Sequence, residues 1–201
     1  MGGDIDLDAL VANVRAFRPR TLPTDGLRHA AVALAVARTG SRLGIWLTRR
    51  TSRLRAHPGQ FALPGGRLDE GEDAVGAALR ELAEELGVAA TRETYVGALD
   101  DYATRSGYVI TPVVLALGDA PALVPNPDEV AEVYAVSLSE LDVEPRYLRI
   151  PESEQPVIQL PLVGSLVHAP TAAIVHQFRE VALHGRATPV AHLEQPVFAW
   201  R

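Results

Sequence analysis

The 201-residue sequence contains no cysteine, which excludes disulfide bonds, thiolate-zinc sites and a cysteine nucleophile. It also has no Gly-x-Ser-x-Gly pattern, the tight turn that carries the nucleophile of many serine hydrolases. The sequence therefore gives no support for catalysis by a cysteine nucleophile or by a serine hydrolase of the Gly-x-Ser-x-Gly type.

Long apolar runs are also missing. The longest, residues 30–37, is far shorter than the roughly 18 residues of a membrane-spanning helix. The first ten residues are acidic and lack the basic and apolar regions of a signal peptide, which indicates a cytoplasmic protein. A net charge of −6 argues against a general nucleic-acid-binding surface, because such a surface must neutralise phosphates. We therefore expect neither a membrane nor a nucleic acid as a partner.

The composition is that of a globular protein. Hydrophobic residues make up 47% of the chain and charged residues 22%, values that fit an apolar core beneath a polar surface. A chain of this length can bury one substantial core. We expect one domain over residues 1–201, with a short N-terminal helix and a helical C-terminal extension.

Apolar periodicity predicts the order of helices and strands. Helical spacing predicts helices over residues 5–17, 137–141 and 171–184, the second capped by Ser137 or Ser139. Short apolar stretches bounded by turn residues predict strands over residues 29–38, 43–48, 94–104, 108–117, 129–136 and 157–163. A helix is the alternative for the alanine-rich stretch 29–38. Pro112 lies in one of these strands and requires a sheet edge or a bulge. The mixture indicates an α+β fold.

Residues 65–88 organise the rest of the chain. They begin with a glycine turn and an acidic loop and continue as one helix. Asp73 is the expected N-cap of this helix, and Gly87 the expected left-handed residue at its end. Apolar residues at helical spacing give the helix one face that packs on a core.

Three carboxylates share another side of this helix. Glu81, Glu84 and Glu85 stand at i, i+3 and i+4, where like charges repel by about 0.2–0.5 kcal/mol per pair. A divalent cation such as Mg²⁺ reverses this repulsion, because it prefers oxygen ligands completed by water and substrate phosphate. The alternative is a solvated acidic helix face, since such triplets are common.

A basic cluster precedes the glycine turn. Within nine residues the acidic chain places four arginines and one histidine, namely Arg49, Arg50, Arg53, Arg55 and His57. Guanidinium groups match phosphate oxygens in pairs, so the cluster is suited to bind phosphate groups. A solvated basic loop is the alternative, but the position directly before the glycine turn favours phosphate binding.

The spacing around the carboxylate helix resembles the Nudix box. That pattern reads Gly, five residues, Glu, seven residues, Arg-Glu, an aliphatic residue, any residue, Glu-Glu, any residue, Gly and an aliphatic residue. Every fixed position is matched, by Gly66, Glu72, Arg80, Glu81, Leu82, Glu84, Glu85, Gly87 and Val88. The resemblance implies a hydrolase of nucleoside diphosphates linked to another group, with a mixed β-sheet between helices.

The basic stretch resembles one subgroup of this family, the coenzyme A pyrophosphatases. Their signature is matched at Leu47, Thr48, Arg50, Arg55, His57, Gly59, Pro64, Gly65, Gly66 and Asp69, and the sequence departs from it at Thr51, Phe61 and Leu63. The resemblance implies cleavage of coenzyme A or acyl-coenzyme A into 3′,5′-ADP and the corresponding 4′-phosphopantetheine. ADP-ribose, NADH or another nucleotide are alternative substrates. A nucleotide-binding protein without turnover is a further alternative.

The Nudix resemblance also implies roles for the acidic residues. Glu81, Glu84 and Glu85, together with Glu72 from the preceding loop, are expected to hold Mg²⁺ or Mn²⁺ that bridges the diphosphate. Glu84 and Glu85 are both candidates to accept the proton of the attacking water, and the sequence does not choose between them. Arg80 is expected to pair with Glu72 and to hold the loop against the helix.

Substrate binding is expected to involve the basic stretch and the glycine turn. Arg50, Arg55 and His57 are expected to bind the remaining phosphate groups. Gly65 and Gly66 let the backbone approach the phosphates without a Cβ in the way.

The rest of the chain offers weaker signals. Glu129 and Glu132 are candidates to assist the metal or the attacking water, with surface carboxylates as the alternative. His168 is one of four histidines that recur every eight residues, about 80° apart around a helix, so they are interpreted as ordinary histidines. The apolar residues 197–200 are expected to dock on the domain or on a partner, which includes a second copy in a homodimer.

Overall fold

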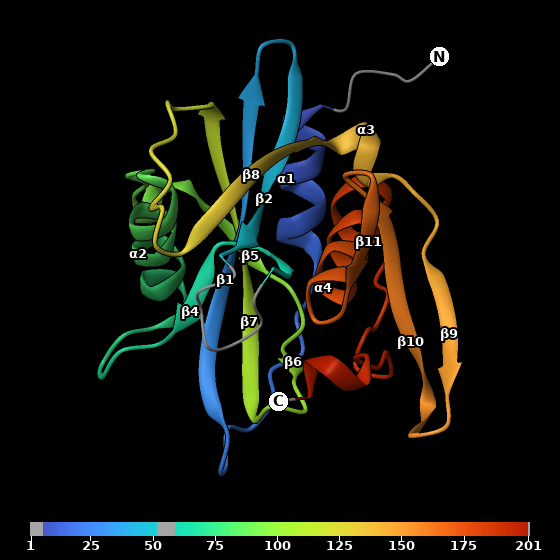
Figure 1. Ribbon diagram of the computed structural model, residues 1–201. Helices are drawn as coiled ribbons and strands as arrows, with labels where there is room; N and C mark the ends of the chain where they lie inside the picture. Colours follow the sequence, from blue (N-terminus) through green and yellow to red (C-terminus); the bar gives the residue numbers. More distant parts are fainter. Residues whose placement is uncertain (1–5, 52–58, 201) are drawn as a thin grey trace.

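The computed structural model describes residues 6–51 and 59–200. Its main element is a mixed β-sheet with the strand order β3-β2-β1-β7-β5, in which β4 also pairs with β1, β6 with β7 and β8 with β2 (Figure 1). The strands are β1 (Arg28–Thr39), β2 (Arg42–Arg50), β3 (Phe61–Ala62), β4 (Gly65–Arg67), β5 (Tyr95–Ala98), β6 (Tyr102–Ala103), β7 (Tyr108–Asp119) and β8 (Val130–Ser137). β1 and β7 pair in parallel, and the other pairs are antiparallel.

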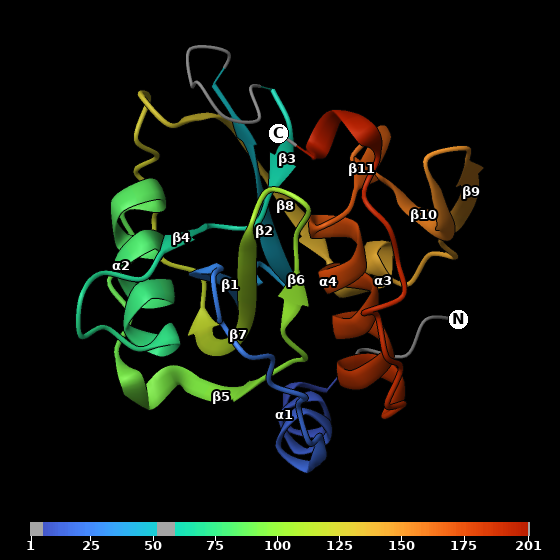
Figure 2. The same ribbon diagram turned by 90° about the horizontal axis from the view of Figure 1, so that it is seen from below.

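Helices cover both faces of this sheet. Helix α2 (Ala74–Leu86) lies on one face, and α1 (Leu7–Ala16) and α4 (Thr171–Phe178) lie on the other (Figures 1 and 2). A second sheet, made of β9 (Arg146–Ile150), β10 (Ser153–Leu162) and β11 (Ser165–His168), packs beside α4. The predicted α+β architecture, a mixed sheet between helices, is confirmed.

The sequence of β1 explains how both faces of the sheet are buried. Leu34 and Val36 belong to the core shared with α1 and α4. The alternating small residues belong to the core beneath α2, namely Ala31, Ala33, Ala35 and Ala37. Successive side chains of a strand point to opposite faces, so the alanines let α2 approach the sheet closely. A strand buried on both faces reads as a continuous apolar run.

Helix α2 begins and ends where the sequence predicts. The side chain of Asp73 accepts a hydrogen bond from the amide of Gly76 at 2.7 Å and also pairs with Arg92 at 2.7 Å. Gly87 ends the helix with a φ of 70°, the left-handed conformation that glycine adopts readily. Both predicted caps are confirmed, and they fix the position of the three carboxylates on the helix.

The strand predicted over residues 94–104 is wrong in one respect, because it is divided into β5 and β6. Asp100 and Asp101 are buried at the break. The carboxylate of Asp100 accepts from the amide of Arg20 at 2.8 Å and from Nε2 of Gln177 at 2.8 Å. Asp101 accepts from the amide of Leu22 at 2.9 Å. These contacts tie the break to the loop after α1 and to α4.

Pro112 lies within β7, an internal strand rather than a sheet edge. β1 flanks it on one side, and β5 and β6 flank it on the other. The carbonyl of Pro112 accepts from the amide of Leu99 at 3.0 Å, so its missing N–H group falls at the break between β5 and β6. The break therefore accommodates the proline.

The C-terminal part holds elements that periodicity did not predict. The helix expected over residues 171–184 is α4 followed by a π-helical turn, Arg179–Leu183. The short helix α3 (Leu138–Leu141) is capped by Ser137 as expected. Strand β9 was not predicted, because four of its five residues are exposed and no buried pattern marks it. Within residues 6–51 and 59–200 no helix is long and apolar enough to cross a membrane.

Candidate active site

The glycine turn brings β4 between β1 and helix α2. Gly65 lies opposite Val32 in β1, and Gly66 lies opposite Ala31. A Cβ on Gly65 would overlap the backbone of Ala31 and Val32, and a Cβ on Gly66 would overlap the carboxylate of Glu81. Both positions therefore need glycine for close packing, and the turn sets the carboxylates of α2 directly against the backbone of β4.

Arg80 is the centre of an ion-pair cluster. Its Nε and Nη2 donate to the two oxygens of Glu72 at 3.2 and 3.0 Å. Its Nη1 donates to Glu81 at 2.8 Å and to Glu84 at 3.1 Å, and Nη2 also donates to the carbonyl of Arg67 at 2.9 Å. The pairing of Arg80 with Glu72 is present, and it engages both Glu72 oxygens. Arg80 thus fastens the loop and β4 to the helix.

We expect Arg80→Lys to lower kcat/KM by about 10–100-fold, the usual effect of losing a partner that orients metal ligands. Lysine keeps the positive charge. Its single ammonium group cannot replace the planar guanidinium, which donates to three carboxylates and one carbonyl at the same time. Arg92→Lys is the matched control, because Arg92 forms an exposed ion pair with Asp73, the N-cap residue of α2, away from the carboxylate cluster. Steady-state kinetics of both variants test this expectation, and equal activities would remove the orienting role of Arg80.

Glu85 is the buried carboxylate of the cluster. It is 3% exposed, whereas the side chain of Glu84 is 55% exposed. Loss of solvation raises the pKa of Glu85 from 4.5 to about 8, the charge of Arg50 opposes this shift, and the charge of Glu81 adds to it. A positive charge placed next to such a buried carboxyl stabilises its ionised form and so offsets the free-energy cost of ionising it.

The chemistry of these donors fits a divalent cation. Glu81, Glu84 and Glu85 offer carboxylate oxygens, which Mg²⁺ and Mn²⁺ prefer, and burial also raises the pKa of Glu81. No three acidic or histidine side chains among the described residues are gathered as a metal cage. The reason is that Arg80 holds Glu81 and Glu84. A cation beside Glu85 therefore competes with Arg80 for their oxygens.

The two carboxylates near the start of β8 differ in position. The negative charge of Glu129 raises the pKa of both Glu81 and Glu85, so Glu129 lies on the α2 side. Glu132 instead accepts from the hydroxyl of Tyr134 and lies 3.7 Å from Arg49. Of the two candidates, Glu129 is the one close to the carboxylate cluster.

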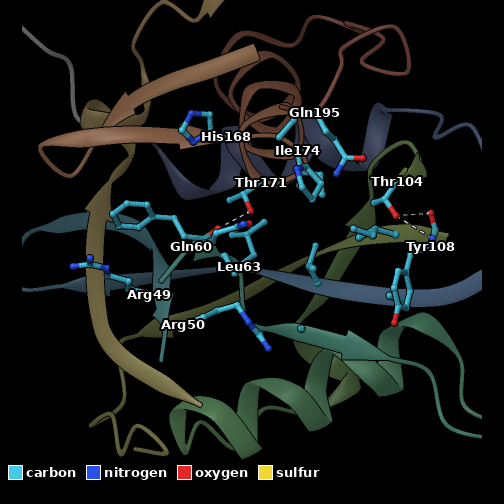
Figure 3. A pocket seen from close by; sticks show the side chains of 18 of the residues that line it. Arg49, Arg50, Gln60, Leu63, Thr104, Tyr108, His168, Thr171, Ile174 and Gln195 are labelled. Atoms are coloured by element: carbon cyan, nitrogen blue, oxygen red, sulfur yellow. Dashed lines mark hydrogen bonds between the residues drawn. The ribbon is translucent and has the colours of Figure 1, made fainter. Parts of the chain in front are cut away.

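A cavity of about 680 Å³ opens beside the glycine turn. Its volume lies within the range of small-molecule sites, roughly 300–1,000 Å³. One wall comes from β1 to β4, and the other comes largely from residues 163–198. Gly65 and Gly66 are in the lining, whereas Glu81, Glu84 and Glu85 of α2 are not, and the carboxylate of Glu81 packs directly against Gly66. Figure 3 shows Arg50 and helix α2 on one side of the cavity and His168 and Gln195 on the other.

Arg50 belongs to the basic cluster that was predicted to bind phosphate, and it lines the cavity together with Arg49, the other described member. It extends towards helix α2 (Figure 3). Its Nε is buried and has no hydrogen-bond partner among the residues that the structure describes. A buried donor without a partner costs about 1–3 kcal/mol, which a bound phosphate oxygen would recover. Arg53, Arg55 and His57 lie outside the described residues, so the roles of Arg55 and His57 remain predictions.

Sequence reasoning missed the second wall of the cavity. His168, Thr171, Gln195 and Phe198 line it. The hydroxyl of Thr171 donates to the carbonyl of Phe61 at 3.1 Å and so ties α4 to β3. Of these residues, His168 stood out in the sequence only as an ordinary histidine, and Phe198 only as part of the apolar segment 197–200 that was expected to dock on the domain or on a partner. Tertiary packing across more than 100 residues brings this wall to the glycine turn, and no local pattern records it.

Alanine substitutions at Gly65 and Gly66 are expected to affect different properties of the protein. Gly66→Ala is expected to reduce turnover with a small change in stability, because the flexible end of Glu81 moves away from the new Cβ. Gly65→Ala is expected to destabilise the protein by about 1–3 kcal/mol, because its Cβ meets backbone atoms of β1. Urea unfolding and steady-state kinetics of both variants separate the two effects. Equal loss of stability in both would contradict the separate roles.

Comparison with known sequences gives a consistent result. The profile of the NUDIX domain matches residues 27–159. A protein described as "Uncharacterized Nudix hydrolase NudL" from Photorhabdus laumondii is 38% identical over 118 residues, which are 58% of this chain and 63% of that protein. This chain therefore spans less than two thirds of that relative. A protein of the same description from Pectobacterium atrosepticum is 34% identical over 164 residues, which are 79% of this chain and 85% of that protein.

A solved structure shares the fold. The crystal structure of a Nudix hydrolase from M. smegmatis, RenU, aligns with a TM-score of 0.51 and 23% sequence identity. The alignment covers 78% of this chain and 86% of that one. At this identity the likeness concerns the fold alone.

Proposed function

Because the chain belongs to the Nudix family of pyrophosphohydrolases, we propose that it hydrolyses the pyrophosphate link of coenzyme A or acyl-coenzyme A with Mg²⁺ or Mn²⁺. The products are 3′,5′-ADP and 4′-phosphopantetheine or its acyl derivative. The observation that carries the proposal is the buried Glu85, set among the carboxylates around Arg80 behind the glycine turn of a large cavity. The coenzyme A assignment rests on the signature residues, of which Arg50, Gly59, Gly65 and Gly66 line that cavity.

Charge repulsion is the main obstacle to this reaction, because the anionic oxygens of a diphosphate repel an attacking water. Arg50 lines the cavity, and its buried Nε has no hydrogen-bond partner among residues 6–51 and 59–200. Gly65 and Gly66 present backbone without side chains, so a diphosphate approaches the carboxylates closely. These groups bind and orient the diphosphate, which lowers the barrier by positioning.

The carboxylates have separate tasks. Glu81, Glu84 and Glu85 would hold the divalent cation. Glu72 was also predicted as a ligand, but both of its oxygens accept from Arg80, so in this proposal it fixes the loop through Arg80. A divalent cation held by Glu81, Glu84 and Glu85 would supply positive charge against the diphosphate and would lower the pKa of the attacking water. Glu85 provides a fixed ligand because it is buried on a capped helix, whereas Glu84 is more exposed and is paired with Arg80 at 3.1 Å.

The positions at which the chain departs from the coenzyme A signature bear on substrate choice. Phe61 and Leu63 line the cavity, so they touch the bound substrate. Thr51 is buried and donates to the carbonyl of Asp128 at 3.1 Å, a contact that holds β2 to the loop before β8. ADP-ribose, NADH or another nucleotide remain the alternative substrates. Binding without turnover is the remaining alternative.

A substrate comparison tests the proposal. The protein is incubated with coenzyme A, dephospho-coenzyme A, ADP-ribose, NADH and dGTP, each with Mg²⁺, Mn²⁺ or EDTA. We expect the highest kcat/KM for coenzyme A and no turnover in EDTA. Faster cleavage of another compound in the set would support pyrophosphate hydrolysis but contradict coenzyme A as the substrate. Saturable binding without any product would point to a binding protein.

A further inference from the structure

The outer wall of the cavity is built by a part of the chain that the NUDIX profile does not cover. The profile ends at residue 159, whereas residues 163–198 supply ten of the lining residues. They come from the turn after β10, from β11, from the start of α4 and from the C-terminal segment, namely Val163, Ser165, Leu166, His168, Ala169, Pro170, Thr171, Ile174, Gln195 and Phe198. This wall faces Arg50 across the cavity (Figure 3).

Gln195 presents a fixed hydrogen-bond donor in this wall. The residue is 2% exposed, and its Oε1 accepts from the backbone amide of Arg105 at 2.7 Å. Because a backbone N–H requires an acceptor, this contact fixes which end of the amide is oxygen. The Nε2 group makes no hydrogen bond to any described residue, although Gln195 lines the cavity. Nε2 is not among the buried polar atoms that lack a partner, so it is open to the cavity and available to donate to an acceptor on a ligand.

Phe198 presents an open aromatic ring to the same space. Its side chain lines the cavity and is 54% exposed, an unusual position for a large apolar group. The ring contacts the imidazole of His168 edge to face, with centroids 5.1 Å apart. His168 lies 2.8 Å from the amide of Gln159, and burial lowers its pKa, so it packs as a neutral ring.

The segment that carries these residues is anchored. Glu194 pairs with Arg105 at 2.5 Å and accepts from the hydroxyl of Ser153 at 2.9 Å. The indole of Trp200 donates to the carbonyl of Gln195 at 2.9 Å. The donor of Gln195 and the ring of Phe198 are therefore held in place before a ligand arrives, which reduces the entropy cost of binding.

We propose that this wall is a nucleobase subsite, in which the base stacks on Phe198 and accepts a hydrogen bond from Nε2 of Gln195. The inference rests on the proposed function for the diphosphate, which then lies towards Arg50 and the glycine turn. A base has the flat face that an exposed ring needs and ring nitrogens or carbonyls that accept from an amide. A flexible chain of methylenes and amides gains less from stacking.

The test measures binding in EDTA, where no turnover is needed. Isothermal titration with adenosine 3′,5′-bisphosphate and with inorganic pyrophosphate compares a ligand that has a base with one that lacks it. Base stacking is worth about 1–3 kcal/mol, so Phe198→Ala is expected to weaken the nucleotide about 5–150-fold and leave pyrophosphate unchanged. Phe198→Tyr keeps the ring and the affinity. Val197→Ala is the control, because Val197 is exposed in the same turn but outside the cavity lining.

Gln195→Glu provides an independent arm. It keeps the oxygen that Arg105 needs and removes the amide donor, so it is expected to weaken nucleotide binding without weakening pyrophosphate binding. Equal weakening of both ligands in Phe198→Ala, or no change in either, would overturn the base subsite. Metal-dependent hydrolysis with an unchanged KM in Phe198→Ala would overturn it and leave the proposed function standing. Binding that depends on the base, without any hydrolysis, would support the base subsite and contradict the proposed function.

Discussion

Replacing Glu85 by glutamine is expected to lower kcat for pyrophosphate hydrolysis by about 10²–10⁴-fold while the protein stays folded. The substitution changes one oxygen to nitrogen and removes one negative charge from the carboxylate cluster. Turnover falls because the cation loses a charged ligand fixed on α2. Folding is retained, because a buried carboxyl with a pKa of about 8 is already costly to ionise.

The matched control for this variant is Glu93→Gln, which removes the same charge from an exposed position just after α2. It is expected to leave turnover unchanged, so it separates the loss of one ligand from the loss of net charge. Circular dichroism and urea unfolding check the fold of both proteins. Full turnover in a folded Glu85→Gln variant would move the metal site away from α2.

The stability of the metal-free protein is expected to fall as the pH rises from about 5 to 8. The pKa of Glu85 is 4.5 unfolded and about 8 in the folded state. Between these values the folded protein retains a proton that the unfolded chain has lost, so raising the pH favours unfolding. Urea unfolding in EDTA at several pH values measures the effect, and the difference between wild type and Glu85→Gln isolates the contribution of this residue.

Addition of Mg²⁺ at pH 8 is expected to reverse this loss in the wild type. A metal at 100 times its dissociation constant stabilises the folded state by about 2.7 kcal/mol, provided that it does not bind the unfolded chain. The gain should be much smaller in Glu85→Gln, and potassium chloride at the same ionic strength should give no comparable gain. If the free energy of unfolding depends on pH and on Mg²⁺ in the same way in both proteins, Glu85 is not a metal ligand.

The parts of the fold that could be predicted are those with local causes. Asp73 and Gly87 bound α2 because a side-chain cap and a left-handed glycine act within one turn of the helix. The cluster around Arg80 follows from helical spacing and from the loop that returns Glu72 to the helix. The buried run of β1 was recognised as a strand for the same reason, since its pattern lies within one segment.

The parts that could not be predicted have distant causes. The break between β5 and β6 arises because Asp100 and Asp101 bind the loop after α1 and the side chain of Gln177. The outer wall of the cavity depends on Gln195, which bonds the amide of Arg105 some 90 residues away. The burial of Glu85, in contrast to the exposed Glu84, depends on how α2 packs against β4. Neither sequence spacing nor propensity records such contacts.

The most direct test of the central claim is product analysis with coenzyme A. The wild-type protein and Glu85→Gln are incubated with coenzyme A in Mg²⁺ or in EDTA, and the products are separated by chromatography. The account predicts 3′,5′-ADP and 4′-phosphopantetheine from the wild type in Mg²⁺ and from no other combination at a comparable rate. Cleavage that persists in EDTA, or that is equally fast in Glu85→Gln, would contradict a metal-dependent site on the carboxylates of α2.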